Sequence, residues 1–510
     1  MEKQIKSQKW PIILFTIGVF MAGLDNGIIS AALTTIYNSF GVSPTWGAWT
    51  VTLYTLGLAI SVPIVGKLSD NYGRKKLFVI EILLFGIGSL LVAVSPNFTT
   101  LLIARFIQAI GGGGIFIIGS SHVLATVPKK QQGKYLGLLG GMHGLSAVIG
   151  PNIGALILHL TGTWQWMFLI NIPIALFLIL MGLNKIPETK QPSVKALDLK
   201  GTIYLSLAII ALMLGITNIN SLNLFASITN ITVLPYILAG ILLLYFFLVH
   251  ERLLEKKGGD PIIAYSLLRK QSFQLTLLLG LLSGGFLASI IFIPSYVQQV
   301  LQVPVENAGF WLTPLALASG VGAGLGGFLT DKIGAKRTII VSGFIGLVGF
   351  LMFFSFVDNL LTFVVASVFA GVGLGFLLGA PLNVLVGESS KKDQYGTSLG
   401  TLSLIRQIGL TLFPTVFASF ITSGIMKIEP TIQAVFGEIN IPFEHIDKGE
   451  GYGEIMAEIA KVEDPYMQEQ LYTIVANVMK SGFQDMFFIA VIISAIVIIV
   501  SIYLQMAKTN

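Results

Sequence analysis

The sequence contains no cysteine, which excludes disulfide bonds and thiolate metal sites. It is also poor in charge, because Asp, Glu, Lys and Arg make up only 11% of the 510 residues, against roughly a quarter in an ordinary soluble domain. Hydrophobic residues make up 54% of the chain. This composition indicates a protein that crosses a membrane many times.

Apolar runs of about twenty residues, long enough to cross a bilayer as a helix, recur along the whole chain. We therefore predict an all-α integral membrane protein with fourteen transmembrane helices. The first run is too long for the core of a signal peptide and is expected to be retained. The predicted spans are 10–34, 47–67, 77–96, 99–126, 135–160, 166–184, 201–218, 232–250, 273–298, 308–330, 338–356, 360–386, 395–423 and 484–506.

The short connections between these spans differ in charge. Lysine and arginine occur in alternate connections, and those at 38–47, 96–99, 162–165, 218–230, 299–307 and 357–360 contain neither. Cytoplasmic loops carry the excess of Lys and Arg, so both termini are predicted to be cytoplasmic in a multi-pass plasma-membrane protein. The net charge of +6 then reflects topology, and no nucleic-acid partner is expected.

One stretch occurs twice: GKLSDNYGRKK, from Gly66, and GFLTDKIGAKR, from Gly327. The two aspartates, Asp70 and Asp331, are 331 − 70 = 261 residues apart. This internal duplication predicts two six-helix bundles, 1–184 and 273–510, joined by a linker, 185–272, that carries spans seven and eight. A single copy would be explained by its positive charge alone, but matching spacing in two copies makes that explanation weak.

The repeated stretch indicates a mechanical role in gating. A glycine lets neighbouring helices approach closely, and an Asp at a helix end accepts hydrogen bonds from an adjacent helix N-terminus. The cations after the turn then face cytoplasmic carboxylates and lipid phosphates. The gating residues proposed in the two copies are Gly66, Asp70, Gly73, Arg74 and Lys75, and Asp331, Gly334 and Arg337.

Ionisable residues inside the membrane are functional candidates, because each is costly unless paired or hydrated. Asp25, about fifteen residues into the first span, is the strongest candidate for proton exchange; a structural hydrogen-bonded role is the alternative. Arg406 is predicted to reach a similar depth from the other bundle, where it either pairs with Asp25 or binds an anionic substrate head. Arg105 is a second partner or a clamp on backbone carbonyls. His143 is a secondary candidate in proton coupling.

The third span carries one further acid, Glu81. It is close to the cytoplasmic face of the predicted span, so we expect it to be solvated.

At these residues the chain resembles the major facilitator superfamily, and in particular its fourteen-span drug:proton antiporter branch. Further stretches carry the resemblance: Leu102 to Gln108 followed by Gly111 to Gly114, Gly150-Pro151-Asn152-Ile153-Gly154, Trp164 to Pro173, and Arg406-Gln407-Ile408-Gly409. Ser146 and Ala155 replace usual glycines, Gln165 replaces a common Arg, and Asn26-Gly27 departs from the first-span motif. The four glycines lack the Lys-Ser/Thr of a phosphate loop and are interpreted as a close-packing or hinge segment.

The resemblance implies a secondary exporter of hydrophobic or cationic drugs in exchange for protons, active in multidrug efflux and antibiotic resistance. Export of a lipid, fatty acid or other amphiphile is the alternative, and a sensor is a third class. Na⁺ is an alternative coupling ion. We expect a monomer surrounded by lipid, with no enzyme activity, cofactor or metal site. Gating at Gly150, Pro151 and Gly154 is implied by the resemblance, and the predicted substrate-cavity residues are Asn26, Gln108, Gln298 and Gln407.

The segment 424–482 lies outside the resemblance. Between Lys427 and Lys480 it holds ten acidic residues and four lysines. We expect an acidic extracytoplasmic insertion with one or two amphipathic helices over the outer mouth. A solvated loop that only connects two spans is the alternative.

Overall fold

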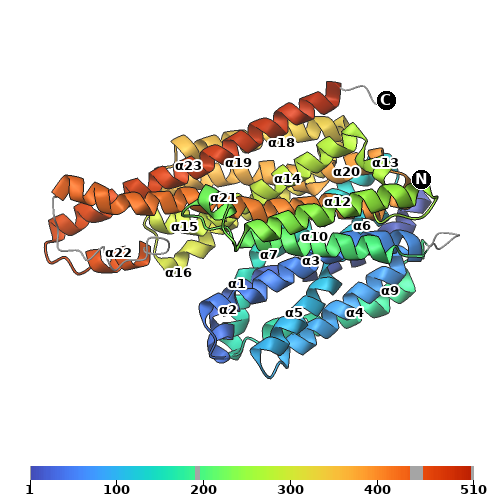
Figure 1. The fold of residues 1–510 in the computed structure, drawn as a ribbon, viewed down its shortest axis with the longest axis horizontal. Helices are drawn as coiled ribbons and strands as arrows, with labels where there is room; N and C mark the ends of the chain where they lie inside the picture. The colour runs from blue at the N-terminus through green and yellow to red at the C-terminus, as the bar shows by residue number, and fades with distance from the viewer. Residues whose placement is uncertain (1, 190–195, 437–451, 507–510) are drawn as a thin grey trace.

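The computed structural model describes residues 2–189, 196–436 and 452–506, and within them the chain forms helices and no strands. Thirteen helices are long and apolar enough to cross a membrane, and a pair bent by 43°, Lys129–Ser146 and Ile149–Thr161, makes a fourteenth span. The all-α prediction with fourteen transmembrane helices is therefore confirmed. Figure 1 shows these helices running side by side in one elongated bundle.

The helices before the linker include two broken or bent spans. The span 98–126 is interrupted at Gly114, where α5 ends and α6 begins. The helices of this part are α1 (Glu2–Ser39), α2 (Pro44–Gly47), α3 (Trp49–Tyr72), α4 (Arg74–Ala93), α5 (Phe98–Gly113), α6 (Ile115–Thr126), α7 (Lys129–Thr161), α8 (Trp166–Leu169) and α9 (Asn171–Lys185).

The last part of the chain repeats this pattern. Its span 360–389 is interrupted at Ala380, between α19 and α20. Its helices are α14 (Gln271–Ile291), α15 (Ile293–Gln299), α16 (Val305–Ala308), α17 (Thr313–Ile333), α18 (Ala335–Ser355), α19 (Leu360–Gly379), α20 (Pro381–Ser389), α21 (Tyr395–Phe436), α22 (Tyr452–Ile459) and α23 (Pro465–Met506). The linker between the two parts forms α10 (Leu199–Thr217), α11 (Leu224–Ile228), α12 (Leu234–Lys256) and α13 (Tyr265–Leu268).

A second mark of the duplication is found at two helix starts. Asn97 begins α5 by accepting a hydrogen bond from the Thr100 amide at 2.9 Å, and Asn359 begins α19 by accepting one from the Thr362 amide at 3.0 Å. In both, the backbone amide of the asparagine donates a hydrogen bond to the threonine hydroxyl, which makes a reciprocal cap. These asparagines are 359 − 97 = 262 residues apart, close to the spacing of the two gating stretches.

Both ends of the described chain lie at one end of the bundle, at the right of Figure 1. We call this the basic end, since it carries the turns at Gly73 and Gly334 with their cations. We call the opposite end, with α2, α16 and α22, the acidic end (Figure 1). The placement of both chain ends on one side agrees with an even number of spans.

The prediction of a separate acidic insertion at 424–482 is corrected in part. α21 continues to Phe436 and α23 begins at Pro465, so the flanks of this segment are extensions of two spanning helices. One short amphipathic helix, α22, is present and buries Tyr452, Ile455 and Ile459. Residues 437–451 lie outside the described residues. The continuous helices are possible because apolar residues, among them Leu471 and Val475, keep a helical spacing beyond the membrane span.

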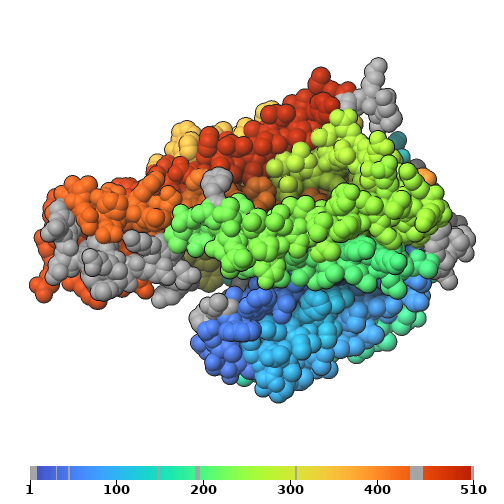
Figure 2. All heavy atoms as spheres, viewed as in Figure 1, coloured from blue at the N-terminus to red at the C-terminus, as the bar shows by residue number. Residues whose placement is uncertain are grey.

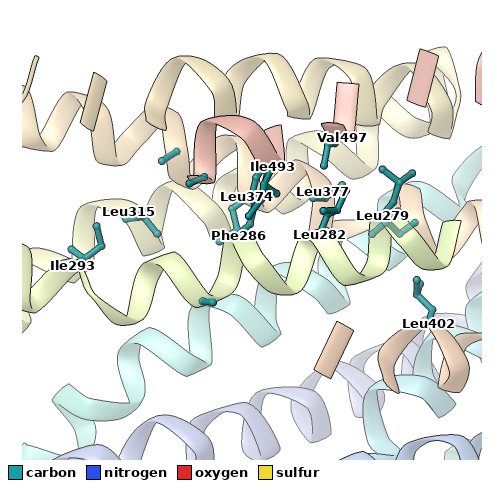
Figure 3. Close-up of a cluster of buried hydrophobic side chains, with 14 of the residues drawn as sticks. Leu279, Leu282, Phe286, Ile293, Leu315, Leu374, Leu377, Leu402, Ile493 and Val497 are labelled. Atoms are coloured by element: carbon teal, nitrogen blue, oxygen red, sulfur yellow. The ribbon is translucent and has the colours of Figure 1, made fainter. Parts of the chain in front are cut away.

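The interior is closed by large apolar side chains and by glycines at helix crossings. In the cluster of Figure 3, Phe286 of α14, Leu374 of α19 and Ile493 of α23 are at most 3% exposed. Gly111 of α5 lies where a Cβ would collide with the backbone of Phe85 in α4. A glycine here lets the two helices approach closely. Such close packing stabilises helix association in a membrane, where no hydrophobic effect drives it.

This packing predicts opposite effects for one substitution at two helical glycines. Gly111→Ala should destabilise the protein by about 1–3 kcal/mol, the usual range for overpacking. Gly324→Ala, in α17 at a place where a Cβ meets nothing within 4 Å, should be neutral or stabilising, since Ala is the better helix former. Thermal unfolding of the detergent-purified variants measures the difference. Equal midpoints for the two variants would contradict this account of the crossing.

Candidate functional site

A cavity of about 640 Å³ lies between the two repeated halves. Its walls come from α1, α3 and α7 on one side and from α14, α17, α19 and α21 on the other, with α10 of the linker contributing Met213, Leu214 and Thr217. In Figure 2 the surface is notched at the acidic end, between the blue and green parts. The volume lies within the range of sites for drug-sized ligands, about 300–1,000 Å³.

The predicted cavity residues divide into two groups. Asn26 and Gln407 line the cavity, as do Arg406 and His143. Gln108 and Gln298 do not. Gln108 is fully buried in a hydrogen-bond network behind the cavity wall, so the prediction that it lines the cavity is wrong.

That network surrounds Asp25. Its carboxylate accepts hydrogen bonds from Arg105 Nη1 at 2.7 Å, from Gln108 Nε2 at 2.8 Å and from Asn171 Nδ2 at 3.1 Å. Ser89 Oγ in turn accepts from Gln108 and Asn171. All five side chains are fully buried, so a charge pair and its polar neighbours are sealed within the apolar bundle.

The helices that supply this network explain its geometry. Arg105 and Gln108 are three residues apart on α5 and therefore share a face, and Arg105 Nη1 also donates to Gln108 Oε1 at 2.6 Å. The guanidinium lies 4.0 Å from the centre of the Tyr54 ring, a cation–π contact. Arg105 Nε and Nη2 have no hydrogen-bond partner among the described residues. Asp25 is thus paired with an arginine, Arg105, that retains unused hydrogen-bond donors.

The expected pair between Asp25 and Arg406 is not formed. Asp25 is paired with Arg105, whereas Arg406 Nε donates to Ser283 Oγ at 3.1 Å. Both arginines are on spanning helices, α5 and α21, and sequence spacing alone could not decide between them. Arg105 reaches Asp25 because α5 and α1 belong to the same half of the molecule.

Glu81 was expected to be solvated, and this is wrong. It is 2% exposed, and its Oε2 accepts a hydrogen bond from the Gly114 amide at 2.9 Å. That amide lies at the interruption between α5 and α6, where a free N–H needs an acceptor. His143 lines the cavity, where its ring lies 5.7 Å from that of Phe116.

The first copy of the repeated stretch closes the basic end through a contact that we call the first latch. Asp70, at the end of α3, accepts hydrogen bonds from the backbone amides of Gly396 at 3.0 Å and Thr397 at 2.9 Å, at the start of α21. Gly66 lies against the Gly396 backbone with no room for a Cβ. Arg74 lies 3.3 Å from Asp70 and donates its Nε to Ser121.

The second copy makes the equivalent contact in the opposite direction, which we call the second latch. Asp331, at the end of α17, accepts hydrogen bonds from the amides of Gly133 at 2.7 Å and Lys134 at 2.8 Å, at the start of α7. Gly327 leaves no room for a Cβ against Gly133. These are the helix N-terminal contacts that the sequence predicts for both aspartates.

The two latches differ in burial and charge. Asp70 is 3% exposed and has Arg74 as an ionic partner. Asp331 is only half-buried, and Ala335 occupies the position equivalent to Arg74. The remaining cations of the second copy point elsewhere, since Lys336 donates to the Leu504 carbonyl and Arg337 is exposed.

The turns after the two aspartates are built alike. Gly73 and Gly334 have φ angles of 99° and 89°, in the region that favours glycine. Lys75, beyond the first turn, is half-buried. The glycines thus let each helix end directly after its aspartate and let the next helix start at once.

A third set of close contacts packs α7 against α1 beside Asp25. A Cβ on Gly150 would collide with Gly27, and one on Gly154 would press on Ala31 and Ile28. Pro151 lines the cavity. α7 therefore connects the surroundings of Asp25 at one end with the amides that bind Asp331 at the other.

The linker is attached to the first latch by Asp260. Its carboxylate binds Lys67 Nζ at 2.6 Å and Asn71 Nδ2 at 3.0 Å. Lys67 and Asn71 are four residues apart on α3 and flank Asp70. Nothing in the sequence motif indicated this partner, because Asp260 follows a Gly-Gly pair in a connection without periodicity.

A second cluster in the linker was also missed. Asp198, His250 and Glu251 bring one ligand atom each to within 4.8 Å of one another, close enough to hold a metal ion. Burial raises the pKa of Asp198, but hydrogen bonds from the Gly201 amide and from His250 outweigh burial and leave this pKa below its usual value. The contact between His250 of α12 and Asp198 at the start of α10, 2.9 Å long, joins the two helices. Glu251 also accepts a hydrogen bond from the Ile263 amide, shortly before α13.

The latches predict how access to the cavity changes when an aspartate is removed. Asp70→Ala and Asp331→Ala should each increase access from the basic end, by about tenfold for Asp70, because hydrogen bonds to a charged group contribute about 1.5–3 kcal/mol. The effect of Asp70→Ala should be larger, since it also leaves Arg74 buried without its partner. The chain has no cysteine, so Ser319→Cys provides a single labelling site in the cavity wall.

The measurement is the labelling rate of that cysteine by an impermeant maleimide added at either face of oriented vesicles. Asp393→Ala is the control, because Asp393 is an exposed acid at the same end. Labelling ratios that equal the wild-type ratio in both latch variants would remove the gating role.

Comparison with known proteins is consistent with this architecture. The chain is 58% identical over 480 residues to the uncharacterized MFS-type transporter YfiU of Bacillus subtilis, covering 94% of this chain and 91% of that one. It is 31% identical to multidrug resistance protein 3 of the same organism, with 82% and 80% covered. It is 29% identical to the riboflavin transporter RibZ of Clostridioides difficile, with 82% and 89% covered.

The fold is shared with a solved structure. The human organic anion transporter MFSD10 (TETRAN) superposes with a TM-score of 0.61 at 13% identity, over 96% of this chain and 99% of that chain. The family description that matches residues 15–414 is the Major Facilitator Superfamily. The chain is therefore a transporter of the Major Facilitator Superfamily, with multidrug transporters among its relatives.

Proposed function

We propose that this protein exports hydrophobic small molecules, including drugs, in exchange for protons by alternating access. The observation that carries the proposal is the sealed network of Asp25 directly behind a drug-sized, largely apolar cavity. Two multidrug relatives support the substrate class. No carboxylate is found among the described residues that line the cavity, so the cationic part of the expected substrate range has no partner there.

Orientation is part of the proposal. The basic end is taken as cytoplasmic, by the distribution of Lys and Arg. Both latches are then closed on the cytoplasmic side, and the cavity belongs to a state that faces outward.

The proposed coupling starts at Asp25. Protonation would remove its charge and leave Arg105 buried without a counterion, an arrangement that is strongly unfavourable. The network must then rearrange, and α7 is placed to respond because Gly150 packs against α1 beside Asp25. The same helix offers its first amides to Asp331. A change at Asp25 could in this way release the second latch.

The first test is Asp25→Asn. It should abolish uphill export of a hydrophobic dye driven by a pH gradient in proteoliposomes, because an amide cannot take up and release a proton. The amide keeps the volume of the side chain but leaves Arg105 without its counterion, so thermal unfolding of the variant is measured as well and export is compared per folded molecule. Asp358→Asn is the control, since this exposed acid pairs with Lys480 far from the cavity. Export by the Asp25 variant at the wild-type rate would exclude Asp25 as the coupling group.

The same vesicles distinguish H⁺ from Na⁺ as the coupling ion. A pH gradient without Na⁺ should drive export, and a Na⁺ gradient at equal pH should not. The opposite result would replace the proton by Na⁺ while leaving the export function intact.

A further inference from the structure

The charges that face the cavity are unbalanced. Arg406 and His143 are the ionisable side chains among the described residues that line it, and no Asp or Glu accompanies them. A cavity built for cations would be expected to offer a carboxylate, because a charge removed from water needs an opposite charge or strong hydrogen bonds.

Arg406 is half-buried and differs in its pairing from the two buried arginines. Arg105 is paired with Asp25, and Arg74 with Asp70. Arg406 forms no ion pair with any described residue, and its one side-chain hydrogen bond there is to Ser283. Its Nη2 atom is buried without a hydrogen-bond partner in this part of the chain. The guanidinium is thus oriented by a single hydrogen bond and keeps donors for another group.

The rest of the wall is apolar. α14 contributes Leu287, Ile290 and Ile291, and α17 contributes Leu315 and Ala316. Asn26 and Gln407 are neutral hydrogen-bonding groups that suit a ligand of either charge. The wall therefore combines one fixed cation with an extended hydrophobic surface.

We propose that the cavity takes amphiphiles with a single anionic head, a carboxylate or sulfonate, and one apolar body. This inference rests on the export function proposed above and specifies its substrate class. Arg406 binds the head with two donors of its planar fork, the geometry that guanidinium shares with carboxylate, and Ser283 holds the fork in place. The apolar body lies along α14 and α17.

The direction of charge movement agrees with this class. With the basic end in the cytoplasm, a proton that enters and an anion that leaves both move with an inside-negative potential. Export of an anionic amphiphile is then driven by the voltage as well as by the pH gradient.

Binding to the detergent-purified protein tests the head-group preference without any transport step. The probes are three pyrene-labelled twelve-carbon chains with a carboxylate, an amide or an ammonium head, and pyrene fluorescence reports binding. Wild-type protein should bind the carboxylate at least tenfold more tightly than the ammonium. Arg406→Gln should lower the affinity for the carboxylate probe at least tenfold and change the affinity for the amide probe by less than twofold. Arg406→Lys should restore part of the loss, because it returns the charge without the fork.

Gln407→Glu is the matched second variant and guards against a misfolded Arg406 variant. It places a carboxylate in the same wall on the same helix with almost no change of shape. It should weaken carboxylate binding and strengthen ammonium binding, so that the ratio of carboxylate affinity to ammonium affinity falls at least tenfold. An ammonium preference in the wild type, an equal loss for all three probes in Arg406→Gln, or an unchanged preference in Gln407→Glu would each overturn the proposal.

The outcome is separable from that of the export function. One outcome is that the pH gradient fails to drive dye export while the wild type still prefers the carboxylate probe and Arg406→Gln still loses that preference. This result would support the anion site and contradict the proton coupling. If export is found but the three probes bind equally, the result supports the export function and contradicts the anionic substrate class.

Discussion

A carboxylate and a guanidinium enclosed in the middle of a membrane protein depend on each other. Each would be strongly unfavourable alone, and breaking a buried pair by removing one partner typically costs about 3–5 kcal/mol. Asp25 and Arg105 satisfy this constraint with Gln108 and Asn171 around them. The positions of α1, α5 and α9 are set by this requirement, because each must bring a polar side chain to one sealed point.

Helix contacts connect that point with the cavity and with both latches. α7 begins at the second latch and lies against α1 through small residues beside Asp25. α3 carries the first latch and is also bound to the linker through Asp260. The linker contributes to the cavity wall through α10. Span seven is therefore part of the cavity wall, whereas most of span eight, α12, lies on the surface.

Much of this could be predicted from the sequence. The spans followed from apolar length, and the latches followed from a repeated glycine-aspartate spacing, since a helix end and a helix start have fixed hydrogen-bonding needs. The partner of Asp25 could not be predicted, because depth along a helix leaves its rotation relative to neighbours open. For the same reason Glu81 and Gln108 were misplaced. Asp260 and the cluster of Asp198, His250 and Glu251 depend on contacts across the linker that leave no periodic signal.

Both latches bind backbone amides, and this affects how the gate tolerates mutation. On the receiving side the donors belong to the peptide chain at Gly396, Thr397, Gly133 and Lys134. Most side-chain replacements at Thr397 and Lys134 leave these donors in place, whereas a Cβ at Gly396 or Gly133 would collide with Gly66 or Gly327 of the opposing helix. Only proline, which has no amide hydrogen, deletes such a donor. Each latch is therefore sensitive to replacement of its aspartate and of the glycine that faces it, whereas the amide donors of Thr397 and Lys134 survive most changes of side chain.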